Sequence, residues 1–289
     1  MAEMGLMEKI VSLAKRRGFV YPGSEIYGGL AGTYDYGPHG VALKNNIKNL
    51  WWKTFVEARD DMYGVDAAIL MNPKVWEASG HVAGFSDPLV ECSNCKSRFR
   101  ADHLADPDTC PSCGKKGTLG EARQFNMMFK THAGAAENES AAVYLRPETA
   151  GGIFVNFKNV VDSFHPKLPF GIAQIGKAFR NEIAPRDFIF RLRELEQMEV
   201  EYFVKPAEWE GAFEDWRGRM HAFAKDIGIN SVHELEVGDG DRAHYSKRTI
   251  DFEFDYPFGR KELWGLAYRT DFDLSAHERA SGASLQYLD

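Results

Sequence analysis

Four cysteines in one short window have a spacing that is typical of a metal site. Cys92, Cys95, Cys110 and Cys113 follow the pattern C-x2-C-x14-C-x2-C. A gap of two residues lets one tight turn present two thiolates to one ion, and Zn²⁺ favours four thiolates in a tetrahedral array. Two disulfides or two redox C-x-x-C motifs are the alternatives, and a reducing cytosol disfavours disulfides. We therefore predict a structural zinc ribbon over residues 88–124, with no coordination position left for catalysis.

A second region, between positions 180 and 199, combines cations with carboxylates in a way that suits an anionic ligand. Its charged members are Arg180, Arg186, Arg191, Arg193, Glu182, Glu194, Glu196 and Glu199. The guanidinium group matches phosphate oxygens bidentately, and carboxylates accept hydrogen bonds from amino groups or help to hold Mg²⁺. The alternative is a ladder of ion pairs on a solvated sheet face.

An antiparallel hairpin is the element that the sequence predicts for this region. Strands are expected over 170–182 and 188–204, joined by a turn that contains Pro185. Alternate residues of a strand share a face, so Arg191, Arg193, Leu195, Gln197 and Glu199 are expected to point one way and Glu194, Glu196 and Met198 the other. Arg180 and Glu182 are expected to share a face of the preceding strand.

The surrounding segments predict a mixed fold. Apolar spacing predicts helices over 6–17, 38–59 and 209–227, and strands over 65–71, 250–256 and 263–267. A glycine-dense structured loop is expected over 21–40, and a mobile loop over 131–140. Hairpins and a few helices without βαβ alternation indicate an α+β fold, in which helices flank an antiparallel sheet.

The composition is that of an ordinary globular protein. The 289 residues are 44% hydrophobic and 27% charged, which suffices for one large or two small domains. No run of about 18 uncharged apolar residues exists, so a membrane span is not expected. Lys15, Arg16 and Arg17 interrupt the apolar run that a signal peptide would need, which predicts a cytoplasmic location. The net charge of −7 argues against a wholesale nucleic-acid coat but allows a local basic face.

Longer strings resemble the class II aminoacyl-tRNA synthetases. Phe179-Arg180-Asn181-Glu182, followed by Arg191-x-x-x-Leu195-x-x-x-Glu199, resembles motif 2 of that class. The strings at 17–38, 145–150, 176–182, 196–199 and 269–274 are similar to the homodimeric type of glycyl-tRNA synthetase. The expected helix over 38–59, with the strand ending at Pro73, resembles motif 1, the dimer-forming element. The similarity covers nearly the whole chain apart from the ribbon, the 131–140 loop and parts of 205–245.

The resemblance implies a glycine–tRNA ligase. The carboxylate of glycine attacks the α-phosphate of ATP, with Mg²⁺ present, and the adenylate then esterifies the terminal adenosine of tRNA(Gly). Arg180 and Glu182 are the implied catalytic residues, the first at the α-phosphate and the second at the adenine amino group. The implied ATP-binding residues are Arg180, Asn181, Glu182, Phe190, Arg191, Leu192, Arg193, Glu194, Leu195, Glu262 and Leu263. The implied glycine-binding residues are Arg100, Glu148, Leu195, Glu196, Gln197, Met198, Glu199 and Arg269.

Some of these residues also have plain structural interpretations. Glu148 follows Pro147 and is explained equally by a helix start. Arg269 is explained by an ion pair with Asp271 or Asp273, and Arg100 by the exit of the ribbon. Glu196 has the opposite parity to Glu199, which places it on the other face of the strand.

Two residues and the end of the chain depart from the family pattern. Leu195 stands where the family has an aromatic residue that stacks on adenine, a contact worth about 1–3 kcal/mol per base in single-strand binding. Gly151 stands where a glutamine is usual. Nothing up to Asp289 corresponds to motif 3 or to an anticodon-binding domain, so residues 1–289 are expected to be a catalytic domain without motif 3, in a C-terminally shortened chain.

Three functions follow as hypotheses. The first is the glycine–tRNA ligase, with a homodimer formed through residues 38–73. The second is a non-catalytic synthetase-like module that binds tRNA or a partner. The third is a relative that adenylates amino acids or loads another carrier.

Overall fold

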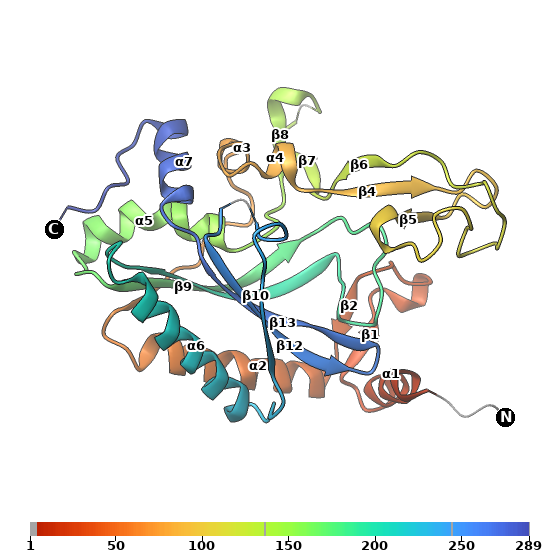
Figure 1. Ribbon diagram of the computed structural model, residues 1–289, viewed down its shortest axis with the longest axis horizontal. Coiled ribbons are helices and arrows are strands. Elements are labelled where there is room, and N and C mark those ends of the chain that lie inside the picture. The colour runs from red at the N-terminus through yellow and green to blue at the C-terminus, as the bar shows by residue number, and fades with distance from the viewer. Residues whose placement is uncertain (1–4, 136, 244, 289) are drawn as a thin grey trace.

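The computed structural model describes residues 5–135, 137–243 and 245–288 (Figure 1). The expectations at position 136, within the predicted loop, and at Asp289 lie outside the described residues. The longer helices are α1 (Leu6–Arg16), α2 (Pro38–Trp52), α5 (Ala150–Phe164), α6 (Trp209–Asp226) and α7 (Phe272–Ser281). Helices α3 (Lys74–Ala78) and α4 (His81–Gly84) are short, and α2 continues into a π-helical turn at Lys53–Glu57. No helix in this part of the chain is long and apolar enough to cross a membrane.

Two long strands form the central hairpin. Strand β9 (Phe170–Phe179) pairs antiparallel with β10 (Glu194–Phe203), and Gln174 lies opposite Glu199. The short β3 (Met62–Gly64) adds a parallel edge to β9. This hairpin has two different faces, because side chains alternate along each strand.

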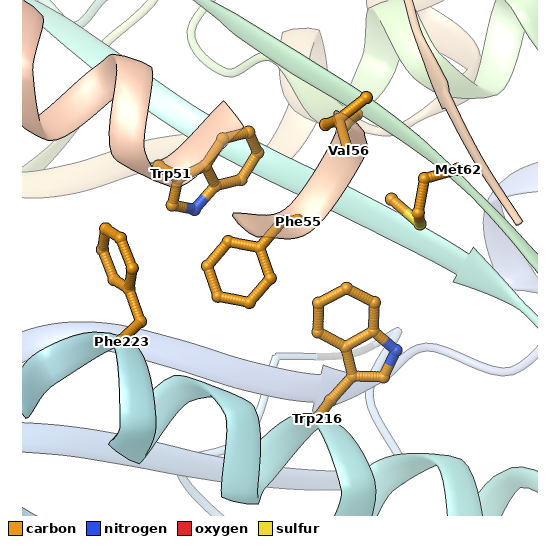
Figure 2. Close-up of a cluster of buried hydrophobic side chains, with 7 residues drawn as sticks. Trp51, Phe55, Val56, Met62, Trp216 and Phe223 are labelled. Carbon is orange, nitrogen blue, oxygen red and sulfur yellow. The ribbon is translucent and has the colours of Figure 1, made fainter. Parts of the chain in front are cut away.

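One face of the hairpin packs against α2 and α6. The buried residues of this face, which we call the first core cluster, are Trp51, Phe55, Val56, Met62, Ala173, Trp216 and Phe223 (Figure 2). The Phe55 ring lies 5.7 Å from that of Trp216 and 5.3 Å from that of Phe223, centroid to centroid. Each buried aromatic side chain removes some 150–250 Å² from water, so this cluster anchors both helices to the sheet.

The other face of the hairpin is covered at one end by α5. Ile153 and Phe157 of α5 pack on Phe170 and Ile172 of β9. Toward the middle of the hairpin the same face of β10 turns polar, with Gln197, Glu199 and Glu201. The polar part of this face therefore lies beside the start of α5.

Further sheets surround the hairpin. Strands β11 (His233–Glu236), β12 (Arg248–Tyr256) and β13 (Gly259–Tyr268) form an antiparallel sheet, and Trp264 and Leu266 of β13 join the first core cluster. Strand β4 (Ser86–Glu91) lies between β5 (Arg98–Arg100) and β6 (Arg123–Asn126). Two small pairs are β1 (Val20–Pro22) with β2 (Tyr34–Tyr36), and β7 (Lys130–His132) with β8 (Ala142–Tyr144).

The structure confirms the predicted helices, the hairpin and the strands near 250–267, and it corrects the strand predicted over 65–71. The strand that pairs with β9 is Met62–Gly64. After a last hydrogen bond from the Val65 amide to the Ala173 carbonyl (2.9 Å) the chain leaves the sheet. Arg146 Nη1 then donates to the Ala67 carbonyl (2.6 Å), and Leu70 makes an isolated antiparallel bridge to Leu145.

The connection between β9 and β10 is longer than predicted. Residues 180–193 lie outside both strands, so the face assignment for Arg180, Glu182, Arg191 and Arg193 was wrong. The loop predicted over 131–140 is the connection of the small β7–β8 hairpin, and Thr131 and His132 belong to β7.

Candidate active site

Arg180 follows β9 and is held at its backbone and at one side-chain nitrogen. Its amide donates to the Arg193 carbonyl (2.9 Å), and its Nε donates to the Pro147 carbonyl (3.1 Å). The guanidinium lies over the Phe85 ring, with Cζ 5.6 Å from the centroid. Next in the chain, the Asn181 amide donates to the Met127 carbonyl (2.7 Å). Among the described residues the two terminal nitrogens of Arg180 have no hydrogen bond, which leaves them for a ligand.

Glu182 is a buried acceptor that lacks a donor. It is 8% exposed, and within the described chain its Oε2 accepts no hydrogen bond. The nearest cation is Arg191, whose Nη1 lies 3.7 Å from that oxygen. Burial raises the pKa of Glu182, an effect that Arg191 opposes. A ligand amino group would satisfy this oxygen.

Arg193 ties the loop to the glycine-dense segment near the N-terminus. Its guanidinium donates to the Glu182 carbonyl (3.2 and 3.0 Å) and to the Ala31 carbonyl (3.0 Å). Its amide donates to Gly32 (2.8 Å). The guanidinium of Arg193 is thus occupied by backbone, in contrast to that of Arg180.

The other implied ATP-binding residues do not share one environment. Phe190 packs edge-on against Tyr256 and Phe258, at 5.1 and 5.0 Å between ring centroids. Glu194 pairs with Lys177. Leu192, Leu195 and Leu263 are partly buried. On β13 Glu262 is exposed to solvent, but the surrounding protein desolvates its carboxylate in part, which with the charge of Asp251 raises its pKa, while Arg180 opposes the shift.

A cluster of carboxylates around Arg269 forms the second part of the site. It contains Glu148, Glu199, Glu201 and Asp273, which we call the carboxylate cluster. Asp273 accepts from Nε and Nη2 of Arg269 (2.8 and 2.9 Å), and the Arg269 Cζ lies 3.7 Å from the Tyr245 ring centroid. The interpretation of Arg269 as a partner of Asp273 is thereby confirmed.

Thr149, at the start of α5, links the carboxylate cluster to β10. Its hydroxyl donates to Oε2 of Glu199 (2.9 Å), and its amide donates to Oε1 of Gln197 (3.1 Å). On its other side, Oε2 of Glu148 lies 3.5 Å from Nε2 of His81. The segment 148–149 thus lies between two sets of polar side chains.

Electrostatics separate the members of the carboxylate cluster. Burial, followed by the charge of Glu148, raises the pKa of Glu199, and burial raises that of Glu201 well above its usual range. Burial also acts on Glu148, but its contact with His81 and the charges of His81, Arg269 and Arg180 together outweigh burial and lower the pKa of Glu148. For Arg269 the charges of Glu201 and Asp273 outweigh burial and raise the pKa. With Arg269 paired to Asp273, the carboxylate cluster suits a cationic group.

Three predicted glycine-binding residues lie away from the carboxylate cluster. Arg100, at the end of β5, pairs with Asp87 (2.5 Å) and Asp102 (2.6 Å). Glu196 pairs with Lys44 (2.9 Å) and Lys48 (2.5 Å) of α2, on the other face of β10. Met198 shares that face and packs on the first core cluster. The opposite placement of Glu196 and Glu199, predicted from strand parity, is confirmed.

Two ionisable residues of the site, Glu201 and His81, were not predicted from the sequence. Glu201 lies two positions after Glu199 on the same strand face, so the alternation applied to Gln197 and Glu199 would have found it. His81 is brought to Glu148 by the fold of the α3–α4 segment, and nothing in its local sequence indicates this contact.

The four cysteines converge. Their sulfur atoms all lie within 4.8 Å of one another. The Sγ–Sγ distances are 3.8 Å for Cys92–Cys113 and 3.7 Å for Cys95–Cys110. A disulfide requires about 2.05 Å, whereas tetrahedral zinc with Zn–S bonds of about 2.3 Å places sulfurs about 3.8 Å apart. The residues present therefore fit a zinc ion.

Comparison with known proteins identifies relatives among the class II tRNA synthetases. The family model described as "tRNA synthetase class II core domain (G, H, P, S and T)" matches residues 129–278. The glycine–tRNA ligase of Treponema denticola is 53% identical over 289 residues, which cover 98% of this chain and 64% of the relative. That of Alkaliphilus oremlandii is 51% identical over 323 residues, covering 100% and 69%. The chain thus spans about two thirds of the length of these relatives.

A solved structure supports the fold. The Giardia lamblia prolyl-tRNA synthetase in complex with prolyl-adenylate superposes with a TM-score of 0.63 at 15% identity, over 86% of this chain and 42% of that one. At this identity the likeness concerns the fold alone. The class II core model matches half of this sequence, and about half of the residues aligned with the two relatives are identical. The chain therefore belongs to the class II aminoacyl-tRNA synthetases, in the family of the glycine–tRNA ligases.

Proposed function

We propose that this chain supplies the catalytic domain of a glycine–tRNA ligase, which activates glycine with ATP and transfers it to tRNA(Gly). The observation that carries the proposal is the position of Arg180. Its Nε donates to the carbonyl of Pro147 (3.1 Å), the residue before Glu148, and Arg180 lies two residues before Glu182 in the chain. Its charge also acts on Glu182, Glu262, Glu148 and Glu199. The α-phosphate is the group that joins adenosine to the amino acid in the adenylate, and a cation between the two subsites is where that phosphate must lie.

On the nucleotide side we assign the α-phosphate to Arg180, the adenine amino group to Glu182 and the γ-phosphate to Arg191. Because Oε2 of Glu182 is buried and accepts no hydrogen bond from the described residues, the amino group of a bound adenine would satisfy this oxygen. Phe190, Leu192, Leu195 and Leu263 would form apolar walls, and Mg²⁺ would neutralise phosphate charge when bound. Arg193 holds this loop through backbone carbonyls. Positioning and charge neutralisation would supply most of the catalysis.

On the amino-acid side we assign the ammonium group of glycine to Glu148 and Glu199, and its carboxylate to Arg269. Asp273 accepts from Nε and Nη2 of Arg269, and we assign the remaining nitrogen, Nη1, to the substrate because no described residue accepts a hydrogen bond from it. Glycine has no side chain to hold, so selection must come from these two charges and from the exclusion of larger amino acids.

We further infer that residues 88–124 form a zinc-ribbon insertion and that the protein is a cytoplasmic homodimer. The convergence of the cysteines supports the ribbon. In the range expected for the dimer contact, Val41, Leu43 and Leu70 are 41%, 51% and 52% exposed.

Replacing Arg180 tests the proposal. In the complete protein that contains this chain, we expect Arg180→Ala to lower glycine-dependent ATP–pyrophosphate exchange by about 100-fold or more, as the loss of one transition-state contact commonly does. Arg219→Ala, on the exposed face of α6, is the matched control and should exchange normally. Near-normal exchange in Arg180→Ala would refute the assignment. Binding of tRNA by a wild-type protein that catalyses no exchange would favour the non-catalytic module.

A further inference from the structure

Three side chains form a line that ends in the carboxylate cluster. Oγ of Ser79 lies 2.8 Å from Nδ1 of His81, and Nε2 of His81 lies 3.5 Å from Oε2 of Glu148. Ser79 is 7% exposed, and the side chains of His81 and Glu148 are 13% and 16% exposed. One imidazole thus bridges a buried hydroxyl and a carboxylate, with one ring nitrogen toward each.

The two partners of the imidazole favour one tautomer of His81. An ionised carboxylate only accepts hydrogen bonds, so Nε2 must carry a hydrogen to interact favourably with Glu148. In the neutral ring Nδ1 is then an acceptor, and the Ser79 hydroxyl, which lies 2.8 Å from Nδ1 and 3.4 Å from the Trp76 carbonyl, would donate over the shorter distance to Nδ1. Such a partner on the second nitrogen fixes the tautomer of a histidine. His81 therefore presents an N–H to Glu148 even when it is uncharged.

The ring of His81 is also fixed by its neighbours. It lies between Trp76 and Phe85, at 5.5 and 5.4 Å between ring centroids, and Trp76 is fully buried. Nδ2 of Asn126 donates to the carbonyls of His81 and Val82 (3.2 and 2.8 Å). The imidazole consequently has little freedom to leave Glu148.

The Glu148 carboxylate lies among charges of both signs, so a hydrogen-bond donor such as His81 is needed to fix its orientation. Glu199 and Glu201 repel it, Tyr245 lies beside the same group of charges, and Arg269 and Arg180 attract it. Arg269 already makes two hydrogen bonds to Asp273. Among the described residues, His81 makes the close polar contact to the Glu148 carboxylate.

We propose that His81, held by Ser79, is a positioning residue that keeps the Glu148 carboxylate aimed at the ammonium group of the amino acid. This inference rests on the proposed function, in which Glu148 binds that ammonium. The opposite pKa shifts of Glu148 and Glu199 agree with it, since the carboxylate that contacts His81 is the one that stays charged most readily. His81 acts through Glu148 and does not touch the reacting atoms.

The test compares two non-reactive ligands in the complete protein. One is the sulfamoyl analogue of glycyl-adenylate, and the other carries a hydroxyl in place of its ammonium group. By titration calorimetry, we expect His81→Leu to weaken the first by about 10- to 100-fold, the range of a lost hydrogen bond to a charged group. The hydroxyl analogue should change by less than about threefold, because it lacks the charge that Glu148 recognises.

Further variants separate positioning from folding. His81→Gln keeps an N–H donor of similar reach and should restore most of the affinity, while Ser79→Ala should lie between wild type and His81→Leu. In exchange kinetics these variants should raise the KM for glycine more than they lower kcat. His221→Gln is the matched control, because the Nε2 of His221 lies 2.5 Å from Glu234 on a different surface, and it should bind both analogues normally.

The outcomes distinguish this inference from the function on which it rests. Wild-type protein that binds neither analogue would overturn the proposed function. Wild-type binding with equal losses of both analogues in His81→Leu, or with no loss, would overturn the role of His81 alone. If His81→Leu does not fold, Ser79→Ala decides, and its failure to discriminate between the analogues would overturn the inference.

Discussion

Glu201 is a carboxylate that the fold holds in an unfavourable place. Burial raises its pKa well above the usual range, and Glu199, Asp273 and Glu148 add to the effect. An acid with a higher pKa in the folded than in the unfolded protein destabilises the fold at pH values above both, and this penalty disappears as the pH falls below the unfolded value of about 4.3. Such a cost is expected where a site accumulates negative charge to bind a cation.

Glu201→Gln should therefore stabilise the protein at neutral pH. We expect the free energy of unfolding to rise by about 1 kcal/mol at pH 7.5 and the difference to vanish below about pH 4. Urea denaturation at several pH values measures it, with Glu208→Gln as the exposed control. Destabilisation at pH 7.5 would instead identify Glu201 as an indispensable partner of Arg269.

At the scale of elements, the strands and helices were predictable where a repeating pattern filled the whole element. The alternation in 250–256 and the helical spacing in 209–227 gave the right elements. Alternation also placed Glu196 and Glu199 on opposite faces of β10. It failed for Arg191 and Arg193, because the parity rule applies only within a strand and the strand begins at Glu194.

The candidate site was predictable only in part for the same reason. Motif strings led to Arg180, Glu182, Glu148 and Glu199; in the structure Arg180 donates to the carbonyl of Pro147, beside Glu148, and its charge acts on the three carboxylates. His81 escaped prediction because its contact with Glu148 depends on the turn between α3 and α4, where Gly80 has a φ of 84°. A contact between segments more than sixty residues apart leaves no periodic trace in the sequence.

The β5–β4–β6 sheet, whose connections carry the four cysteines, is the element whose stability should depend on a metal. Strand β4 pairs with β5 over three residue pairs, and an Arg100–Asp87 ion pair joins the same strands. So short a sheet gains much of its order from the four thiolates when they hold one ion. Its β4 strand follows α4 directly, which connects this sheet to the segment that carries His81.

Removing the metal should loosen this sheet and leave the central hairpin intact. We expect about one zinc per chain by elemental analysis, released by a strong chelator under reducing conditions. Hydrogen exchange of amides in 86–126 should then accelerate, while exchange in 170–203 stays slow. A protein expressed with ample zinc that contains none would contradict the ribbon, as would unchanged exchange after the metal is removed.

At the scale of the whole molecule, one end of the protein exposes an unusual amount of apolar surface. Helix α1 is amphipathic, yet it buries none of its residues, and Leu6, Ile10 and Leu13 are 63%, 40% and 51% exposed. In the loop between β1 and β2, Ile26 and Tyr27 are 89% and 86% exposed. Figure 1 shows α1, β1 and β2 at the same end, beside α2. Large exposed apolar surfaces mark interaction sites on soluble proteins.

The proposed homodimer gives this surface an occupant, because Val41 and Leu43, in the range 38–73 expected for the dimer contact, are also exposed (41% and 51%). In a two-fold dimer each changed side chain meets the interface twice, so a charge there is doubly unfavourable. We expect the double substitution Ile26→Asp with Tyr27→Ser to convert a dimer into a monomer at micromolar concentration, measured by sedimentation velocity. Leu235→Asp, a similarly apolar exposed position on β11, should leave the dimer unchanged. A wild-type protein that stays monomeric up to high concentration would refute the dimer, and a double variant that remains dimeric would move its interface away from α1 and this loop.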